Sequence, residues 1–238
     1  MISKELYEKY YPDESKNGTI KFYNFLRGGL SRDFIVANIG AGLTSRNKVR
    51  SLKGEVKKVI GLDIDPDVMN NKDLDEAYVI KESFPLEDSS VDMAWSDYVL
   101  EHIEKPDVFL KEVYRILKPG GYYYFRTPNI FNYVSIISRF TPHFVHSVIS
   151  NRVRSLSENE HEPYKTYYRL NSGKVLLKYS RRAGFSGIHL KYIEAEPSYL
   201  MFHPIPFYLG VFYERLVNKF EALCFLRSDI LGRFEKGK

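Results

Sequence analysis

Phe34-Ile-Val-Ala-Asn-Ile39 is an apolar run that stops at Gly40-Ala-Gly42, and this stretch decides the fold class. A short apolar run that ends in glycine is typical of a buried parallel strand followed by a tight turn. Glycine bends the backbone sharply and lets a ligand approach, because no Cβ stands in the way. We therefore predict a strand over residues 34–39 and a turn at 40–42 that is able to bind a ligand.

Outward from this turn, apolar strands alternate with helical stretches along most of the chain. Further strands are expected at 56–62, 77–80, 91–95, 122–126 and 187–193, and helices at 3–10, 19–30, 44–53, 106–117 and 171–182. This alternation favours a doubly wound, Rossmann-like α/β fold, in which a mostly parallel sheet carries helices on both faces.

Two regions depart from the alternation. Residues 130–170 are an insertion of helical character that carries Arg and His, and the tail 204–238 is first apolar and then amphipathic. A chain of 238 residues suits one α/β domain with an added subdomain. We therefore expect an N-terminal helical cap (1–33), a core (34–129), the insertion (130–170) and a closing part with the tail (171–238).

The composition is that of an ordinary soluble protein, with 44% hydrophobic and 27% charged residues. The single cysteine, Cys224, excludes an intramolecular disulfide and a cysteine-based metal site, which favours a reducing, cytoplasmic compartment. The sequence has no apolar secretory signal and no run of about 18 apolar residues. A transmembrane span is therefore not expected, whereas contact with a membrane surface stays open.

Positive charge is concentrated in the second half of the chain. Residues 1–138 carry 19 Lys and Arg against 21 Asp and Glu, whereas residues 139–238 carry 16 against 9. A basic half of this kind suits nucleic acid, anionic lipid, or an acidic or phosphorylated small substrate. A solvated surface without a special partner is an equally good interpretation.

A carboxylate follows the second expected strand. Asp63 lies 21 positions after Gly42, and a carboxylate there can accept hydrogen bonds from both hydroxyls of a ribose. Asp63 would also suit a turn beside Asp65-Pro66, but its spacing from the glycines favours a nucleoside ligand. Ser45 stands where the dinucleotide fingerprint has its third glycine, which argues against a nicotinamide enzyme.

Six motifs between residues 34 and 129 resemble, in their order and spacing, those of class I S-adenosylmethionine (SAM)-dependent methyltransferases. They are Asn38-Ile-Gly-Ala-Gly42, Gly61-Leu-Asp-Ile-Asp-Pro66, Phe84-Pro-Leu-Glu-Asp-Ser-Ser-Val-Asp92, Tyr98-Val-Leu-Glu-His-Ile103, Arg115-Ile-Leu-Lys-Pro-Gly-Gly121 and Thr127-Pro-Asn129. None of them is specific alone, but their combination is. The resemblance implies a seven-stranded sheet, SAM as the cofactor and S-adenosylhomocysteine as its product.

The resemblance also implies a cofactor site. Its residues are Asn38, Gly40, Ala41, Gly42, Asp63, Ile64, Glu82, Ser96 and Asp97. The glycine turn would pass under the methionine part of SAM, Asp63 would bind the ribose hydroxyls, and Ile64 would pack on the adenine. Ser96 and Asp97 would border the methionine and the transferred methyl group. The family often has an Asp that meets the adenine amino group, and Glu82 stands in its region as a substitute.

Methyl transfer to a hydroxyl benefits from a general base, and histidine is the obvious residue type. His102 lies in the Leu-Glu-His motif, where the histidine of the family can also be structural. His143 and His146 lie in the insertion, which the resemblance places as a helical cap over the active site, although each also suits a surface or packing role. We take these three as the candidate bases.

Glu101-His102 is similar to the metal-binding motif of small-RNA 2′-O-methyltransferases. That motif requires a carboxylate three residues before the Glu, and this chain has Tyr98 there. We therefore predict that no metal site is present.

The second half resembles the closing part of bacterial methyltransferases that are often found with polysaccharide or natural-product pathways. The segments concerned are Tyr167-Tyr-Arg-Leu-Asn171, Arg182-Ala-Gly-Phe185 and Tyr213-Glu-Arg-Leu-Val-Asn218. Tyr167, Tyr168 and Arg169 would then approach the acceptor, since Arg can clamp a carboxylate or phosphate and Tyr can stack on a sugar. Locking of the insertion to the core is an equal alternative for these three residues. The aromatic tail would pack on the sheet or form a homodimer, with a membrane surface as the less favoured alternative.

The leading functional hypothesis is methyl transfer to a hydroxyl of a small molecule, such as a sugar or a glycosylated or lipid-linked intermediate. An RNA or nucleotide methyltransferase is the first alternative and is favoured by the basic second half. The chain has no appended RNA-binding motif and no Asn-Pro-Pro-Tyr-like sequence, so nucleic acid is the less expected partner. A non-catalytic SAM-fold protein that binds a nucleoside or serves as a scaffold is the second alternative.

Overall fold

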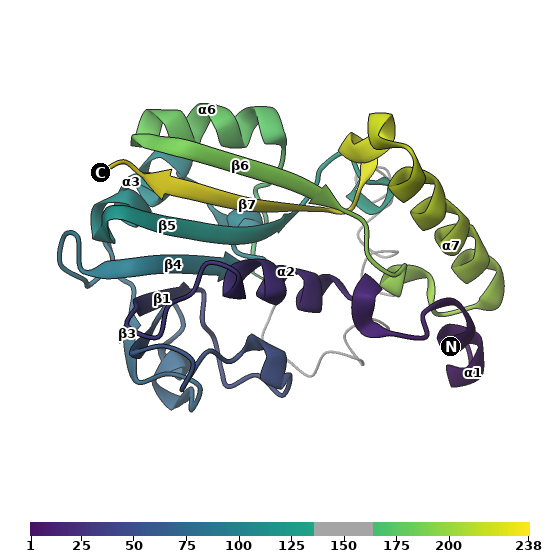
Figure 1. Ribbon diagram of the computed structural model, residues 1–238, viewed down its shortest axis with the longest axis horizontal. Helices are drawn as coiled ribbons and strands as arrows, with labels where there is room; N and C mark the ends of the chain where they lie inside the picture. The colour runs from purple at the N-terminus through teal and green to yellow at the C-terminus, as the bar shows by residue number, and fades with distance from the viewer. Residues whose placement is uncertain (136–163) are drawn as a thin grey trace. The chain divides into compact units, whose positions relative to one another are not determined.

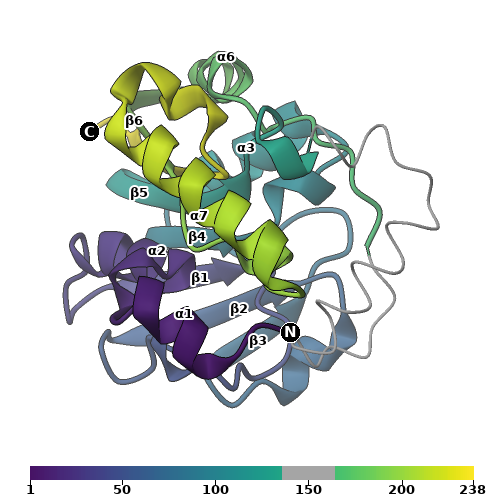
Figure 2. The same cartoon turned by 90° about the vertical axis from the view of Figure 1, so that its right-hand side faces the viewer.

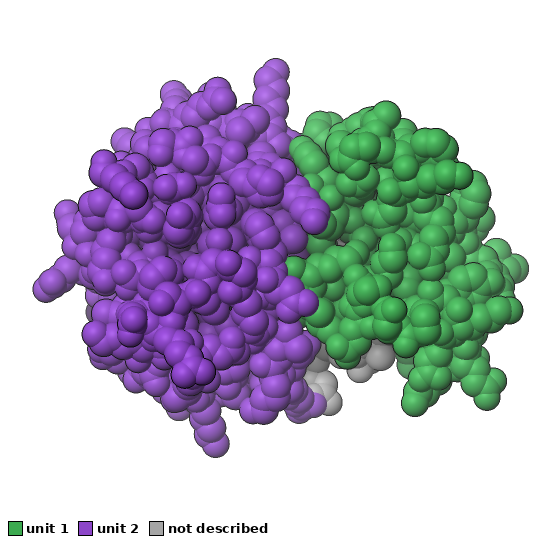
Figure 3. Space-filling view, in the orientation of Figure 1, with its two compact units in different colours: residues 1–21, 128–165, 192–229 green, residues 22–127, 166–191, 230–238 purple. Residues whose placement is uncertain are grey.

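A computed structural model of the 238-residue chain describes residues 1–135 and 164–238. Two of the candidate bases, His143 and His146, and most of the insertion lie outside the described residues. The chain divides into two compact units (Figure 3). Unit 1 consists of Met1–Lys21, Pro128–Lys165 and Tyr192–Asp229, and unit 2 consists of Phe22–Thr127, Thr166–Lys191 and Ile230–Lys238.

A seven-stranded sheet with the strand order β3-β2-β1-β4-β5-β7-β6 organises the fold (Figure 1). Its strands are β1 (Ile35–Ile39), β2 (Lys58–Asp63), β3 (Glu76–Val79), β4 (Val91–Asp97), β5 (Leu117–Pro128), β6 (Phe185–Ile193) and β7 (Asp229–Lys236). Strands β3, β2, β1, β4 and β5 pair in parallel, whereas the arrow of β7 points opposite to that of β6. The predicted doubly wound, mostly parallel sheet is confirmed.

Helices cover both faces of the sheet. Figures 1 and 2 show α2 (Gly18–Arg27) on one face, and α3 (Pro106–Ile116) and α6 (Gly173–Ala183) on the other. Each uses an apolar stripe: the ring of Phe25 on α2 packs edge-on against Tyr124 of β5, with centroids 5.1 Å apart, and Leu110 and Val113 of α3 are fully buried. These helices agree with the predicted ones.

The helix expected over residues 44–53 is wrong. Only Lys48–Arg50 form a single 3₁₀ turn there. The Oγ of Ser45 accepts a hydrogen bond from the Asn47 N–H (3.2 Å), and the Oδ1 of Asn47 accepts one from the Val49 N–H (3.0 Å). Side-chain acceptors of this kind compete with helical hydrogen bonds, so the polar segment stays a loop.

The tail contains a helix and a strand that was not predicted. Helix α7 (Pro204–Lys219) accounts for its amphipathic part, and β7 follows between β5 and β6. In unit 1, α7 packs against α1 (Lys4–Tyr10) (Figures 1 and 2). None of the helices in the described part of the chain combines the length and apolar character needed to cross a bilayer.

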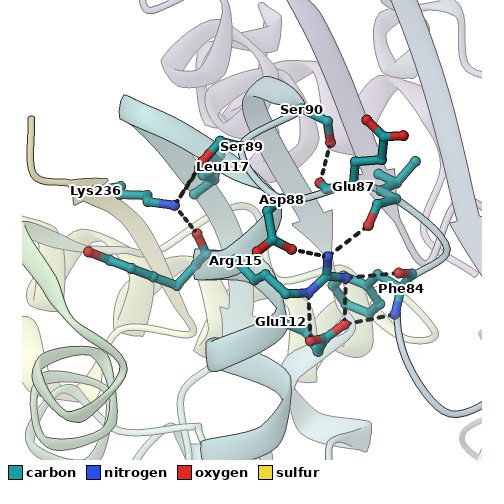
Figure 4. A network of polar contacts seen from close by, with 11 residues as sticks. Phe84, Glu87, Asp88, Ser89, Ser90, Glu112, Arg115, Leu117 and Lys236 are labelled. Atoms are coloured by element: carbon teal, nitrogen blue, oxygen red, sulfur yellow. Dashed lines mark hydrogen bonds and ion pairs between the residues drawn. The ribbon is translucent and has the colours of Figure 1, made fainter.

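Arg115 explains why two of the sequence motifs occur together (Figure 4). Its guanidinium donates to the backbone carbonyls of Leu86 (2.7 Å) and Phe84 (2.9 Å) and to the carboxylates of Asp88 and Glu112 (2.8 and 2.9 Å). The hydrogen bonds to Glu112 and Asp88 raise the pKa of Arg115, so the guanidinium stays charged. The motif that ends α3 therefore holds the loop that precedes β4.

Candidate functional site

The site lies in unit 2, at the carboxyl ends of β1 and β4. The strand order reverses between these two neighbours, and in open α/β sheets a ligand binds beyond the strand ends at such a switch point. Gly40-Ala-Gly42 follows β1, and Tyr98 follows β4. The sheet thus brings the two predicted halves of the cofactor site to one edge.

Both glycines of the turn have left-handed backbone conformations, with φ of 76° at Gly40 and 53° at Gly42. A Cβ at Gly40 would collide with the side chain of Val99, whereas a Cβ at Gly42 would meet nothing within 4 Å. Gly40 is therefore required by packing between the two strand ends. Gly42 borders open space, which a ligand is able to fill.

Asp63, at the end of β2, is held by two backbone donors. Its Oδ2 accepts from the Gly42 N–H (2.8 Å) and its Oδ1 from the Asp65 N–H (2.9 Å). Asp63 is 8% exposed, and its neighbour Ile64 is 61% exposed. Because a carboxylate oxygen can accept more than one hydrogen bond, Asp63 is oriented and still able to receive two hydroxyls. An exposed aliphatic side chain stands beside it.

Hydrogen bonds from neighbouring residues hold the backbone of the turn. The Nδ2 of Asn71 donates to the carbonyls of Ala41 (3.2 Å) and Gly42 (2.9 Å), and the Gly40 N–H donates to Leu62 (2.7 Å). Asn38 lies within β1, half-buried, and pairs in register with Gly61 on one side and Trp95 on the other. The turn is therefore held in place by hydrogen bonds from within the protein.

Ser96 and Asp97 end β4, but their side chains are engaged within the protein. The hydroxyl of Ser96 is buried and lies 2.6 Å from that of Tyr123. The carboxylate of Asp97 forms a bidentate ion pair with Arg126 of β5, with Nε–Oδ1 and Nη2–Oδ2 distances of 2.7 and 2.9 Å. Both side chains are nearly inaccessible, with 7% of Asp97 and 2% of Arg126 exposed.

Sequence reasoning missed the residues around this ion pair. The ring of Tyr98, at a left-handed φ of 59°, lies 4.3 Å from the Arg126 guanidinium carbon, and Arg50 comes within 3.8 Å of the Asp97 carboxylate. Burial and the charge of Asp97 raise the pKa of Tyr23 to about 12. The parallel register, which pairs Asp97 with Arg126, is the signal that could have revealed the ion pair.

The Leu-Glu-His motif forms a 3₁₀ turn, Leu100–His102, directly after β4. The carbonyl of Glu101 accepts hydrogen bonds from the N–H groups of Tyr167 (2.7 Å) and Tyr168 (3.1 Å). His102 is half-buried on this turn. The structure therefore brings the predicted acceptor segment 167–169 to the turn that carries one candidate base.

Arg169 and the neighbouring polar groups extend this cluster. The Arg169 guanidinium donates to the carbonyl of Glu104 and lies 5.4 Å from the ring centre of Tyr167. Beneath them, Asn171 donates to Thr127 (2.7 Å), whose hydroxyl lies 3.4 Å from the Glu101 carboxylate. Tyr168 and Arg169 are exposed and Tyr167 is half-buried, whereas Glu101, Thr127 and Asn171 are buried.

Glu82 is exposed in the loop after β3. No group of three or more His, Cys, Asp or Glu side chains able to hold a metal ion occurs in residues 1–135 and 164–238.

The glycine turn and Asp63, predicted to bind a nucleoside, thus lie at the sheet edge that also leads into the turn with His102. Residues 38–125 match the family model described as a methyltransferase domain. This segment is a class I SAM-dependent methyltransferase domain. The methyltransferase domain holds the glycine turn, Asp63 and the Leu-Glu-His turn, and its cofactor is SAM. No curated protein matches the sequence of this methyltransferase.

Solved structures share the fold of the chain over most of its length. One is a chain of the Haloferax volcanii complex that contains the Trm112 methyltransferase activator, with 20% identity over 98% of this chain and 95% of that one, at a TM-score of 0.57. A SAM-dependent methyltransferase from Thermotoga maritima is 18% identical over 98% of this chain and 93% of that one, with a TM-score of 0.56. A third is phosphoethanolamine N-methyltransferase 2 from Haemonchus contortus, solved with phosphomonomethylethanolamine and S-adenosylhomocysteine. It is 17% identical over 98% of this chain and 56% of that one, with a TM-score of 0.56. At such identities the likeness shows the fold alone.

Proposed function

We propose that this methyltransferase transfers the methyl group of SAM to a hydroxyl of a small molecule, such as a sugar or a glycosylated or lipid-linked intermediate. The observation that carries the proposal is the contact between two segments. The Glu101 carbonyl binds the N–H groups of Tyr167 and Tyr168, so aromatic and basic side chains suited to a sugar or a phosphate lie beside His102.

The described residues fit the cofactor. The open space at Gly42 admits the methionine part over the turn, and Asp63 is oriented to accept from the ribose hydroxyls. Ile64 has an exposed aliphatic face for the adenine, and Glu82 supplies the one predicted acidic group near the adenine amino end. The Ser96 hydroxyl is buried against Tyr123, so the end of β4 would border the methyl group through its backbone and through the Asp97–Arg126 pair.

SAM supplies an activated methyl group, so the main task of the chain is to align an acceptor with it. His102 would accept the proton of the acceptor hydroxyl. Tyr167 and Tyr168 would pack on the acceptor ring, and Arg169 would face an acidic or phosphorylated group. An acceptor of this chemistry agrees with the exposure of Tyr168 and Arg169.

The test combines cofactor binding with methyl transfer. Calorimetry with S-adenosylhomocysteine should show binding, and SAM with a labelled methyl group should label a sugar or lipid-linked sugar in an acceptor panel. His102→Gln should lower kcat by about 100-fold or more and leave S-adenosylhomocysteine affinity unchanged. His189→Gln, on β6 beside Phe25, is the matched control and should retain full activity.

Each failure points to a different part of the proposal. Absence of S-adenosylhomocysteine binding would refute the cofactor site. Labelling of RNA, or of an amine, in place of a hydroxyl would refute the acceptor class and leave the cofactor site standing. Full activity of His102→Gln would remove His102 as the base.

A further inference from the structure

Helix α7 of unit 1 exposes a stripe of large apolar side chains. Ile205, Tyr208, Leu209 and Phe212 are 65%, 46%, 65% and 67% exposed. At 3.6 residues per turn they fall, together with the half-buried Leu216, within an arc of roughly 100° on one side of the helix. Tyr199 and Phe202 just before the helix and Phe220 just after it are also exposed. We call these residues the α7 face.

The α7 face is not the packing face of the helix. Phe207, Gly210, Val211, Glu214 and Val217 form the opposite side and are buried. There the rings of Phe207 and Tyr10 pack edge to face, with centroids 5.9 Å apart, and Arg215 donates to the carbonyl of Tyr10 (2.9 Å). The helix is thus anchored to α1 by one side, and its equally apolar other side faces outward.

The charges of α7 show which partner suits this face. The helix carries two basic side chains, Arg215 and Lys219, and both are exposed. Its one acidic side chain, Glu214, is fully buried and bound by Lys16 at 3.0 Å and by Arg215 at 3.3 Å. Lys219 falls within the apolar stripe of the helix, and its charge is positive. Long basic side chains at the edge of an apolar stripe reach toward anionic headgroups while their stems lie along apolar surface.

A second copy of the chain fits the α7 face less well. A two-fold interface brings the same patch together from both subunits, so its charged rim must complement itself. The exposed Lys219 within the stripe has no exposed acidic counterpart on the helix. We propose that the α7 face binds the surface of an anionic membrane, with the helix lying in the plane of the headgroups. This role goes beyond methyl transfer and does not depend on the identity of the acceptor.

Vesicle flotation with the full chain tests the proposal. The chain should float with vesicles of equal parts phosphatidylcholine and phosphatidylglycerol, and bind less to phosphatidylcholine alone. Leu209→Asp/Phe212→Asp should lower binding by about tenfold or more, because it removes two apolar anchors. Lys219→Glu should weaken binding to the anionic vesicles about fivefold.

Two control variants make the same chemical changes on α3 of unit 2. Val108→Asp replaces an apolar side chain that is 52% exposed, and Lys111→Glu reverses an exposed charge. Both should bind vesicles like the wild type. S-adenosylhomocysteine binding should be equal in every variant, which separates membrane binding from the cofactor site.

Two results would overturn the proposal. One is a wild-type chain that binds S-adenosylhomocysteine but does not float with anionic vesicles. The other is a wild-type dimer in light scattering that Leu209→Asp/Phe212→Asp converts to a monomer, with no binding to vesicles; the α7 face would then be a subunit interface.

Discussion

Two buried acidic side chains, one in each unit of the chain, are held in opposite ways. In unit 2, Asp97 forms a bidentate pair with Arg126, and both carboxylate oxygens are bound. In unit 1, Glu194 is 4% exposed and accepts one backbone hydrogen bond, from Ser228 at 2.7 Å. The nearby Lys21 ammonium donates to the backbone carbonyl of Glu194 (3.0 Å) rather than to its carboxylate.

The comparison shows two ways in which the free-energy cost of burying a carboxylate is met. A fixed cation beside Asp97 offsets the loss of water, so the edge of the sheet keeps its charges in set positions. Without such a partner, burial raises the pKa of Glu194 from its ordinary 4.5 to about 8. Asp97 at the sheet edge is therefore held by paired charge, whereas Glu194 exchanges a proton near neutral pH.

The largest expected effect comes from breaking the Asp97–Arg126 pair. Asp97→Asn should lower the free energy of unfolding by about 3–5 kcal/mol, because it removes the carboxylate that forms two hydrogen bonds with a buried guanidinium. Asp107→Asn is the matched control, since Asp107 faces Arg182 at 3.8 Å with both side chains about half exposed; it should cost less than about 1 kcal/mol. Urea unfolding measures both.

The double variant Asp97→Leu/Arg126→Met sharpens this prediction. It removes both charges, so it should be more stable than Asp97→Asn despite the greater change in sequence. If Asp97→Asn were as harmless as Asp107→Asn, paired charge would not organise the sheet edge.

The fold was predictable because its signals are local. The apolar run that ends at Gly40 and the amphipathic stretch 106–117 each follow from neighbouring residues, and the structure has β1 and α3 there. β7 was missed because Phe212, Leu216, Phe220 and Leu223 suggest one long helical tail. The strand itself is buried on both faces at Ile230 and Leu231, so it lacks the alternation that marks a half-exposed strand.

The candidate site was only partly predictable, for a related reason. Asp63 lies 21 positions after Gly42, and this spacing can be read directly from the sequence. Arg126 meets Asp97 across 29 positions and only after β4 and β5 pair. Its place in Tyr-Tyr-Tyr-Phe-Arg126 gives no local sign that a guanidinium will be buried. The roles of Ser96 and Asp97 as direct neighbours of the methyl group stay predictions.

The two glycines of the turn give the next largest effect. Gly40→Ala should lower the free energy of unfolding by about 3 kcal/mol, since it combines a left-handed φ with a collision against Val99. Gly42→Ala should cost only about 1 kcal/mol, because its Cβ meets nothing. Its effect should appear in calorimetry as weaker S-adenosylhomocysteine binding. Equal destabilisation by the two variants, with unchanged binding for Gly42→Ala, would contradict this division of roles.

The smallest expected change in the free energy of unfolding is the pH dependence that Glu194 of unit 1 contributes. Because its pKa is raised in the folded state, the folded chain binds more protons than the unfolded chain between pH 4.5 and about 8. Stability therefore falls as pH rises through this window and is greatest at its acidic end, with a slope of up to about 1.4 kcal/mol per pH unit.

Glu194→Gln stays neutral and should remove this slope. Between about pH 6 and about pH 7, urea unfolding should show the wild type losing on the order of 1 kcal/mol more than Glu194→Gln. Glu8→Gln on α1, where the carboxylate is 56% exposed beside Lys4, should retain the wild-type slope. If Glu194→Gln also kept the wild-type slope of stability against pH, Glu194 would be charged in the folded chain. Glu194 and Asp97 would then not differ in the way that they are buried. If the slope of stability against pH is flattened in Glu194→Gln alone, the pH dependence comes from Glu194 and not from the Asp97–Arg126 pair.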